Sequence, residues 1–163
     1  MTFDIVVAVS NNNGIGFNGK IPWKSKEDMK FFKNLTCSTR DPTKKNAIIM
    51  GRITFESLNE NPLKDRDNFV ISRTTYKNVK SFTSLNECLE NIDKDYETVF
   101  VIGGTTLYCE AVNHPLCDKI YLNTINVSCE CDKFFTYDES KFKKLSEMSI
   151  CNNVHSTLLK RII

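Results

Sequence analysis

One carboxylate, that of Asp28, stands at the head of an apolar stripe in the segment WKSKEDMKFFKNL. Phe31, Phe32 and Leu35 follow at i+3, i+4 and i+7, which places them on its face of a predicted helix. Burial disfavours the charged form of a carboxylate, so we expect the pKa of Asp28 to be raised. Such a group could bind a polar, protonatable ring or control a proton inside an apolar pocket. The alternative is structural, because Asp28 also occupies the capping-box position after the N-cap Ser25.

A second candidate is the pair Gly103-Gly104 in FVIGGTTLY, where a strand-like run meets a plausible helix. A backbone without side chains allows a ligand to approach closely, and the exposed amides of a helix N-terminus attract phosphate. A tight turn is the alternative explanation of the same two glycines.

The segment GIGFNG (14–19) matches the spelling of the dinucleotide-binding fingerprint G-x-G-x-x-G. The fingerprint requires a helix to begin there, but Pro22 removes a backbone donor and disfavours helix at the residue before it. Asp41, the acid about 20 residues further on, precedes a strand and cannot take the ribose role. We therefore reject a Rossmann site and predict a mobile lid that ends at Pro22-Trp23, with an ordinary surface loop as the alternative.

The elements that must position these residues alternate between strands and helices. Strand-like runs occupy 3–9, 46–50, 68–72, 98–102 and 119–125, and helix-like stretches occupy 25–36, 52–59, 84–92 and 104–113. Because several of the strands are continuously apolar, the alternation predicts an α/β fold on a largely parallel sheet. The segments 143–150 and 155–162 flank the spacer CNNV and predict a closing antiparallel hairpin.

Length and composition fit one globular domain, with 163 residues, 40% hydrophobic and 26% charged. The net charge of +2 and the lack of like-charge blocks argue against nucleic-acid and membrane-surface binding. Neither a signal peptide nor a transmembrane helix is predicted. The seven cysteines include the C-x-C of Cys129 and Cys131, but two histidines complete no zinc spacing. We therefore predict no metal, and reduced thiols in a cytoplasmic protein.

Several segments, in register, resemble the dihydrofolate reductase family. They are IVVAVSNNNGIGFNGKIPW (5–23), DMKFF (28–32), IIMGRITFESL (48–58), PLKDRDNFVISR (62–73) and FVIGGTTLY (100–108). They span roughly residues 3 to 135, and independent motifs in the same order argue against coincidence. The resemblance implies a single domain over 1–163, with a mostly parallel central sheet of about eight strands, about four flanking helices and an antiparallel C-terminal hairpin.

The resemblance also implies an activity, the NADPH-dependent reduction of 7,8-dihydrofolate to tetrahydrofolate. Hydride would pass to C6 and a proton to N5, in support of one-carbon metabolism and thymidylate synthesis. The expected partners are this small substrate and antifolates such as methotrexate, without nucleic acid or membrane. We expect a monomer, unless the chain is fused to thymidylate synthase as in some members of the family.

The resemblance assigns three sets of site residues. The catalytic set is Asp28, which would bind the pteridine N3 and 2-amino group, together with Trp23 and Asn123. The substrate set is Val6, Ala8, Met29, Phe32, Leu58, Leu63, Arg66, Ile102 and Tyr108, with Arg66 opposite the glutamate tail. The cofactor set is Ala8, Ile15, Gly16, Gly51, Arg52, Ile53, Thr54, Ser72, Arg73, Gly103, Gly104, Thr105, Thr106 and Leu107.

Two features of the cofactor set are specific to the family. The Gly-Gly pair is joined there by a cis peptide and lies against the cofactor. Arg52 and Arg73 would lie beside the phosphates, including the 2′-phosphate, because guanidinium groups match phosphate geometry. The alternative is that both arginines are solvated surface residues.

The sequence departs from the family at several of these positions. Asn123 stands where a threonine usually supports the catalytic carboxylate; it could still donate to Asp28, and we predict activity with altered pH dependence. Asp65 replaces a common glycine and could weaken binding of the folate tail or distort the turn. Phe55 replaces a common tryptophan, a packing variation. Asp132 aligns with an acid that contacts the active-site loop, or is a plain turn residue.

Two other functions remain open at this point. A riboflavin-type pyrimidine reductase would keep the fold and the cofactor, but Asp28 and Arg66 argue against it because that substrate has no glutamate tail. A catalytically silent homologue would bind NADPH and antifolates without oxidising the cofactor. Asn123 and Asp65 are the features that favour this second alternative.

Overall fold

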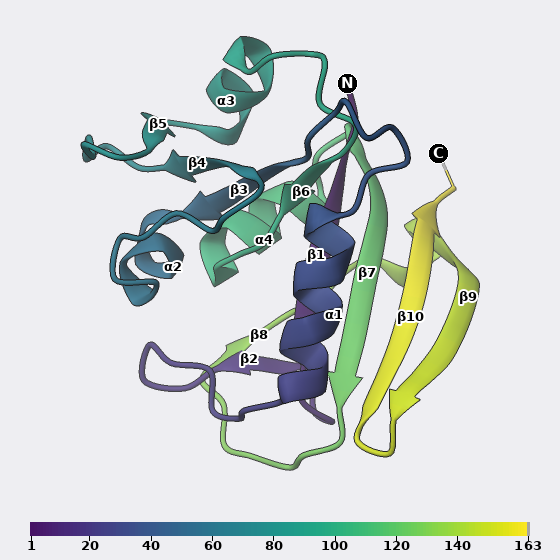
Figure 1. Cartoon of the computed structure of the whole chain (residues 1–163). Coiled ribbons are helices and arrows are strands. Elements are labelled where there is room, and N and C mark those ends of the chain that lie inside the picture. Colours follow the sequence, from purple (N-terminus) through teal and green to yellow (C-terminus); the bar gives the residue numbers. More distant parts are fainter. Residues whose placement is uncertain (163) are drawn as a thin grey trace.

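An eight-stranded sheet forms the centre of the molecule (Figure 1), in the order β5-β4-β3-β6-β1-β7-β10-β9. The computed structural model describes residues 1–162 of the chain. The strands of this sheet are β1 (Phe3–Val9), β3 (Ala47–Gly51), β4 (Asp67–Ile71), β5 (Lys80–Phe82), β6 (Val99–Val101), β7 (Cys117–Ile125), β9 (Phe142–Cys151) and β10 (Val154–Arg161). Pairing is parallel from β5 to β7 and antiparallel from β7 through β10 to β9. The predicted mostly parallel sheet and its closing hairpin are confirmed.

Four helices cover the two faces of the sheet, as predicted. They are α1 (Lys26–Cys37), α2 (Arg52–Ser57), α3 (Leu85–Asn91) and α4 (Thr105–Val112), and a 3-10 turn, η1, spans Glu139–Lys141. Ser25 and Ser84 are the N-cap residues of α1 and α3, because each hydroxyl accepts from the backbone N–H three residues later. Helices α1 and α2 pack on one face and α3 and α4 on the other, and Figure 1 shows α1 in front of β1 and β7.

The central strands are buried on both faces, which explains their continuous apolar runs. In β1, Ile5, Val7 and Val9 pack with α3 and α4, whereas Val6 packs on the opposite face with the residues of α1 and α2. Successive side chains of a strand point to opposite faces, so one strand supplies both cores. The sheet is therefore fixed from both sides, and its carboxyl edge is a rigid support for side chains.

Three short strands were not predicted. Strand β5 extends the large sheet, while β2 (Gly14–Gly16) and β8 (Lys133–Phe134) form a separate two-stranded sheet. The predicted lid is therefore not a loop throughout, because its first part pairs with a segment more than 110 residues away. No helix begins before Lys26, which agrees with the rejection of a Rossmann site.

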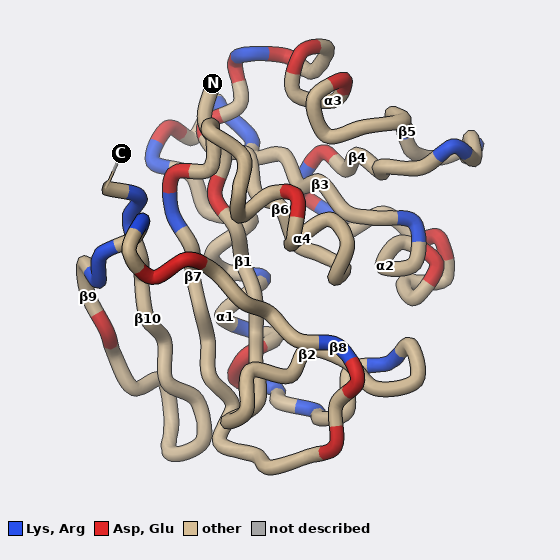
Figure 2. The backbone as a smooth tube through the Cα atoms, turned by 180° about the vertical axis from the view of Figure 1, so that it is seen from behind, with Lys and Arg blue, Asp and Glu red and all other residues tan. Residues whose placement is uncertain are grey.

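Residues of both charges are distributed along the chain. Figure 2 shows the positions of lysine and arginine and those of aspartate and glutamate scattered over the backbone. Within the described residues, none of the helices has the length and apolar character needed to cross a membrane. All seven cysteines are free thiols.

Candidate active site

The predicted site residues gather at the carboxyl ends of β1, β3, β6 and β7. Ala8 and Asn123 are register partners near the ends of β1 and β7. Gly51 ends β3, and its N–H donates to the carbonyl of Gly103, which follows β6, at 2.7 Å. The carboxyl edge of parallel strands is where α/β proteins bind their ligands, because the loops and helix N-termini converge there.

Asp28 and Asn123 form the chemical centre of this edge. Asn123 Nδ2 donates to Asp28 Oδ1 at 2.9 Å, joining the first turn of α1 to the end of β7. Burial raises the pKa of Asp28, as predicted, and the hydrogen bond from Asn123 lowers it in part. The Ser25 hydroxyl caps the Asp28 N–H at 3.1 Å, but the Asp28 carboxylate is turned toward Asn123. Capping therefore involves the backbone of Asp28 and leaves its carboxylate available for chemistry.

Asn123 has an unused acceptor. Its side chain is 2% exposed, and Oδ1 is the one buried side-chain polar atom within residues 1–162 that lacks a hydrogen-bond partner. The orientation follows from chemistry, because only the amide nitrogen can donate to a carboxylate. A buried acceptor without a partner costs about 1–3 kcal/mol, so a donor from a ligand or a water would be stabilising here.

The glycine pair is joined by a cis peptide bond, as the resemblance implied. Gly103 has a φ of 121°, and a Cβ there would lie 3.1 Å from Tyr108 Cε2. A Cβ on Gly104 would meet Thr54 Oγ1 at 3.4 Å. Gly103 is therefore required by the fold itself, a reason additional to the close approach of a ligand that the sequence suggested.

Tyr108 connects the strands next to the glycine pair. Its hydroxyl lies 2.7 Å from the carbonyl oxygen of Val6 and 2.8 Å from that of Ile102, bridging β1 and the end of β6. Burial raises the pKa of the hydroxyl, so it stays protonated as a donor. Helix α4 begins at Thr105, and its N-cap residue, Gly104, has no side chain to cap the first amides. The first amides of α4 are thus open to an anion.

The two arginines predicted beside the phosphates are both exposed but differ in their contacts. Arg52 Nη1 donates to Glu56 Oε1 at 3.0 Å and to Oε2 at 3.1 Å, an i,i+4 ion pair on α2. Arg73 has no ion-pair partner among residues 1–162. Ser72, beside it, accepts from the Thr74 N–H. Arg73 is therefore available to bind an anion, whereas Arg52 would first have to leave Glu56.

Arg66 is buried, with 8% exposure, and no carboxylate of the described chain pairs with it. Its Nε donates to the Lys64 carbonyl at 2.8 Å and its Nη1 to Thr36 Oγ1 at 3.0 Å, while the guanidinium lies 6.0 Å from the Phe32 ring centroid. Neutral acceptors thus orient a cation that lacks a counter-charge. Sequence reasoning missed Thr36; its i+4 spacing from Phe32, whose carbonyl it bonds, was the available signal.

Asp65 does not pair with Arg66, so it does not compete with a ligand carboxylate for the guanidinium. Asp65 instead occupies the left-handed region at φ 68°, in the turn before β4. That conformation explains why a glycine suits this position, and aspartate tolerates it better than most residues.

The remaining predicted residues differ in their exposure. Val6, Gly16 and Leu107 are buried, and Trp23 is half-buried between the first loop and α1. Met29 and Ile53 are 68% and 63% exposed. The others are partly buried: Ile15, Phe32, Thr54, Leu58, Leu63 and Ile102; of the α4 threonines, Thr105 is partly buried and Thr106 exposed. Phe55 is fully buried against Tyr76, with ring centroids 5.0 Å apart, which confirms it as a packing residue.

The chain is similar to known proteins over most of its length. The sequence model described as dihydrofolate reductase matches residues 2–159. The chain belongs to the dihydrofolate reductase family. It is 43% identical over 156 residues to a bifunctional dihydrofolate reductase-thymidylate synthase of Daucus carota, covering 87% of this chain and 30% of that protein. The dihydrofolate reductase of Heliothis virescens is 37% identical over 159 residues, covering 90% of this chain and 86% of the insect protein.

A second insect dihydrofolate reductase, from Aedes albopictus, is 37% identical over 153 residues, covering 86% of this chain and 82% of that protein. The chain thus spans about a third of the length of the plant bifunctional relatives. Stand-alone and bifunctional proteins are thus both among the relatives of this chain.

The first loop of this family member is held by Asp132, as the resemblance suggested. Asp132 Oδ2 accepts from the Asn18 N–H at 3.0 Å, and the Asp132 N–H donates to the Gly16 carbonyl at 2.9 Å. The acid is therefore a loop contact and more than a turn residue.

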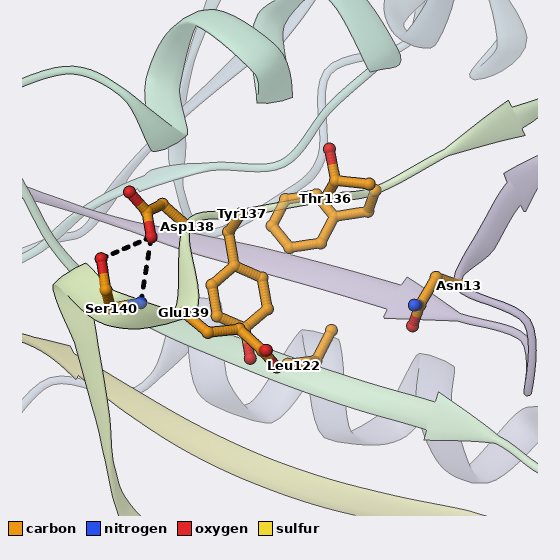
Figure 3. A pocket seen from close by; sticks show the side chains of 8 residues that line it. Asn13, Leu122, Thr136, Tyr137, Asp138, Glu139 and Ser140 are labelled. Atoms are coloured by element: carbon orange, nitrogen blue, oxygen red, sulfur yellow. Dashed lines mark hydrogen bonds between the residues drawn. The ribbon is translucent and has the colours of Figure 1, made fainter.

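A separate cavity of about 470 Å³ lies away from these residues (Figure 3). Leu122 lines it and belongs to the core on the α3–α4 side, opposite the face of Asn123. Asp138 in its wall accepts from the backbone N–H and the hydroxyl of Ser140. None of the predicted site residues lines this hollow, and the Asp138 carboxylate already accepts two hydrogen bonds from Ser140.

Proposed function

We propose that this chain reduces 7,8-dihydrofolate to tetrahydrofolate with NADPH. Membership of the dihydrofolate reductase family supports the reaction class. The single observation that carries the proposal is the half-buried Asp28 carboxylate, held by Asn123 and with a raised pKa, at the carboxyl edge of the sheet. A carboxyl group of this kind matches a protonatable heterocycle whose reduction consumes a proton.

On this proposal, Asp28 binds the N3 and 2-amino donors of the dihydropterin and thereby orients the ring. The unpartnered Oδ1 of Asn123 accepts a further hydrogen from the 2-amino group or from a water beside it. Phe32, Leu58 and Ile102 supply partly buried apolar surface around the ring. The apolar surface excludes bulk water, so that the proton reaches N5 under the control of the Asp28 site.

Arg66 would bind the α-carboxylate of the substrate's glutamate tail. Its burial without a carboxylate partner supports an anionic ligand group, since a buried cation is stabilised by a counter-charge. The substrate of a pyrimidine reductase has no glutamate tail for Arg66 to bind.

The residues at the glycine corner fit NADPH. The open amides of α4 and the exposed Arg73 suit phosphate groups, and the glycine backbones at Gly51 and Gly104 leave room beside Thr54. When bound, the cofactor supplies the hydride; the chain's own residues orient the two rings against each other. Arg52 joins the phosphate site once it leaves Glu56.

We further propose one folding domain over 1–163 and a cytoplasmic location. The two cores share one sheet, which supports a single domain. Seven unpaired thiols support a reducing compartment. The assembly is a monomer, or the reductase part of a chain fused to thymidylate synthase.

The test of the function is Asp28→Asn, measured by NADPH oxidation on addition of 7,8-dihydrofolate with and without methotrexate. We expect methotrexate-sensitive oxidation by the wild type and a loss of roughly 10²- to 10⁴-fold near neutral pH in the variant, with NADPH binding retained. Glu27→Gln, an exposed neighbour in the same helical turn, is the matched control.

Near-normal turnover of Asp28→Asn would assign Asp28 to helix capping. A wild type that binds NADPH and methotrexate but does not oxidise the cofactor would instead favour the silent binding homologue.

A further inference from the structure

Two thiols outside the proposed active site lie almost in contact. Cys129 Sγ and Cys131 Sγ are 3.7 Å apart in the segment between β7 and β8, and both side chains are partly exposed. The proposed reaction uses neither of them.

The Cys131 sulfur packs against the first loop. It lies 3.9 Å from Ser10 Oγ, which also accepts the Gly14 N–H at 3.0 Å. A Cβ built on Gly14 would lie 2.1 Å from this sulfur, so the absence of a side chain at Gly14 makes room for it. The next residue, Asp132, holds the loop through Gly16 and Asn18. The thiol pair therefore adjoins the contacts that anchor β2 to β8.

We propose that Cys129 and Cys131 are a thiol–disulfide exchange site whose oxidation repositions the first loop. A small-molecule disulfide of the glutathione type is the oxidant. One cysteine thiolate attacks it and forms a mixed disulfide, releasing one small thiol. The second cysteine thiolate attacks the protein sulfur of that mixed disulfide and releases the other small thiol. Two protein thiols are thus oxidised to one intrachain disulfide while one small disulfide is reduced to two thiols.

The backbone around the pair permits closure. An S–S bond of about 2.05 Å requires the sulfurs to approach from their present separation by less than ~2 Å. Within residues 1–162, no backbone hydrogen bond involves 128–131, whereas those of Val127 and Asp132 flank this stretch. Closure draws Cys131 toward Cys129 and away from Ser10 and Gly14, so the anchor of the loop changes with the redox state.

The first arm of the test is mass spectrometry of the full chain incubated with oxidised glutathione. We expect wild type to lose the mass of two hydrogen atoms, with peptide mapping locating the link between Cys129 and Cys131. Cys129→Ser should instead retain glutathione at Cys131, because no second thiol can displace it. Cys151→Ser, which removes another partly exposed cysteine, is the matched control and should form the link normally.

The second arm reads the loop without relying on activity. The chain has one tryptophan, Trp23, at the end of the first loop, so its fluorescence should change on oxidation and return with dithiothreitol. The rate of NADPH oxidation, which rests on the proposed function, should fall roughly tenfold in the linked form, because displaced groups lose their productive geometry.

Failure to form the Cys129–Cys131 link would overturn the exchange site. A link that leaves the tryptophan fluorescence and the turnover unchanged would overturn its coupling to the loop. An inactive reduced wild type that still forms the link and shifts the fluorescence would count against the proposed reaction and leave the thiol site supported.

Discussion

Among single residues, Asn123 has the most direct contact with the Asp28 carboxyl group. It donates to Asp28 from its amide nitrogen, while its buried Oδ1 has no hydrogen-bond partner among residues 1–162. A hydroxyl at this position would be shorter and would present its acceptor from the same atom that donates. Asn123 therefore donates from one atom and carries its acceptor on another.

Replacing Asn123 should shift the pH dependence of hydride transfer. A donor favours the charged carboxylate, so Asn123→Ala should raise the pKa of Asp28 further and keep it protonated to higher pH. We expect the alkaline limb of the pH–rate profile to move to higher pH. Asn123→Thr, which retains a donor, should also change the profile, but by less.

Single-turnover rates across pH are the appropriate measurement, and Thr124→Ala, on the opposite face of β7, is the control. Superimposable profiles for wild type and both Asn123 variants would remove Asn123 from the acid–base chemistry.

Asp65 provides a separate prediction about stability. Its left-handed backbone suits glycine, so Asp65→Gly should increase the free energy of unfolding by about 0.5–1 kcal/mol. Denaturant unfolding measures this difference. Because Asp65 makes no ion pair with Arg66, substrate affinity should be unchanged; a destabilised variant would contradict the prediction.

The resemblance to the family implied that Asn123 lies behind Asp28, and the two side chains are hydrogen-bonded. It did not predict why Gly103 is glycine, since the reason is a tertiary contact with the ring of Tyr108 and a backbone angle. The buried Thr36–Arg66 bond was not predictable either, because it joins residues 30 positions apart, and the i+4 spacing of Thr36 from Phe32 signals only the local bond. The Arg52–Glu56 pair, by contrast, could have been found from its i,i+4 spacing.

At the scale of elements, α2 carries both Arg52, the cation proposed to bind a cofactor phosphate, and Glu56, the carboxylate that pairs with it. Both partners are about half exposed, so the ion pair is weak and exchangeable. On the proposed function, phosphate competes with Glu56 for the Arg52 guanidinium, and this ion pair would lower the affinity for the cofactor.

Glu56→Gln should tighten NADPH binding, because it frees Arg52 and removes a negative charge near the phosphates. We expect the Kd to fall roughly two- to fivefold at low ionic strength, and less at high salt. Titration calorimetry would measure it, with Glu90→Gln on α3 as the control. An unchanged Kd would indicate that Arg52 does not reach the cofactor.

The long strands and all four helices were predictable from their hydrophobic patterns, with serine caps as a further signal for α1 and α3. Strands β2, β5 and β8 were not, since they are two or three residues long and, unlike β6, do not lie in an apolar run. Their pairing depends on partners distant in sequence, above all the contact of β2 with β8.

For the whole molecule, the buried Asp4 couples stability to pH. Burial raises its pKa from 3.8 to about 6, with Lys119 opposing. Between these two values the folded state holds a proton that the unfolded state has lost, so this residue's contribution to stability falls as pH rises and then levels off.

Asp4→Asn should remove that slope and increase the free energy of unfolding at pH 7 by on the order of 2 kcal/mol. Denaturant unfolding at several pH values, compared with the exposed Asp93→Asn, isolates the effect. Parallel curves for wild type and Asp4→Asn would mean that Asp4 ionises normally in the fold.

The alternation of apolar strands and helices was enough to predict the parallel sheet, and with it the edge at which ligands bind. The angle and packing of the glycine corner required the structure. That corner limits which substitutions the chain tolerates. A side chain at Gly103 would crowd the ring of Tyr108 and strain the backbone, so variants at this position should fold poorly. A ligand that draws its affinity from the main chain of Gly103 would therefore meet the same surface in every variant that folds, whereas one that depends on the exposed Met29 would not.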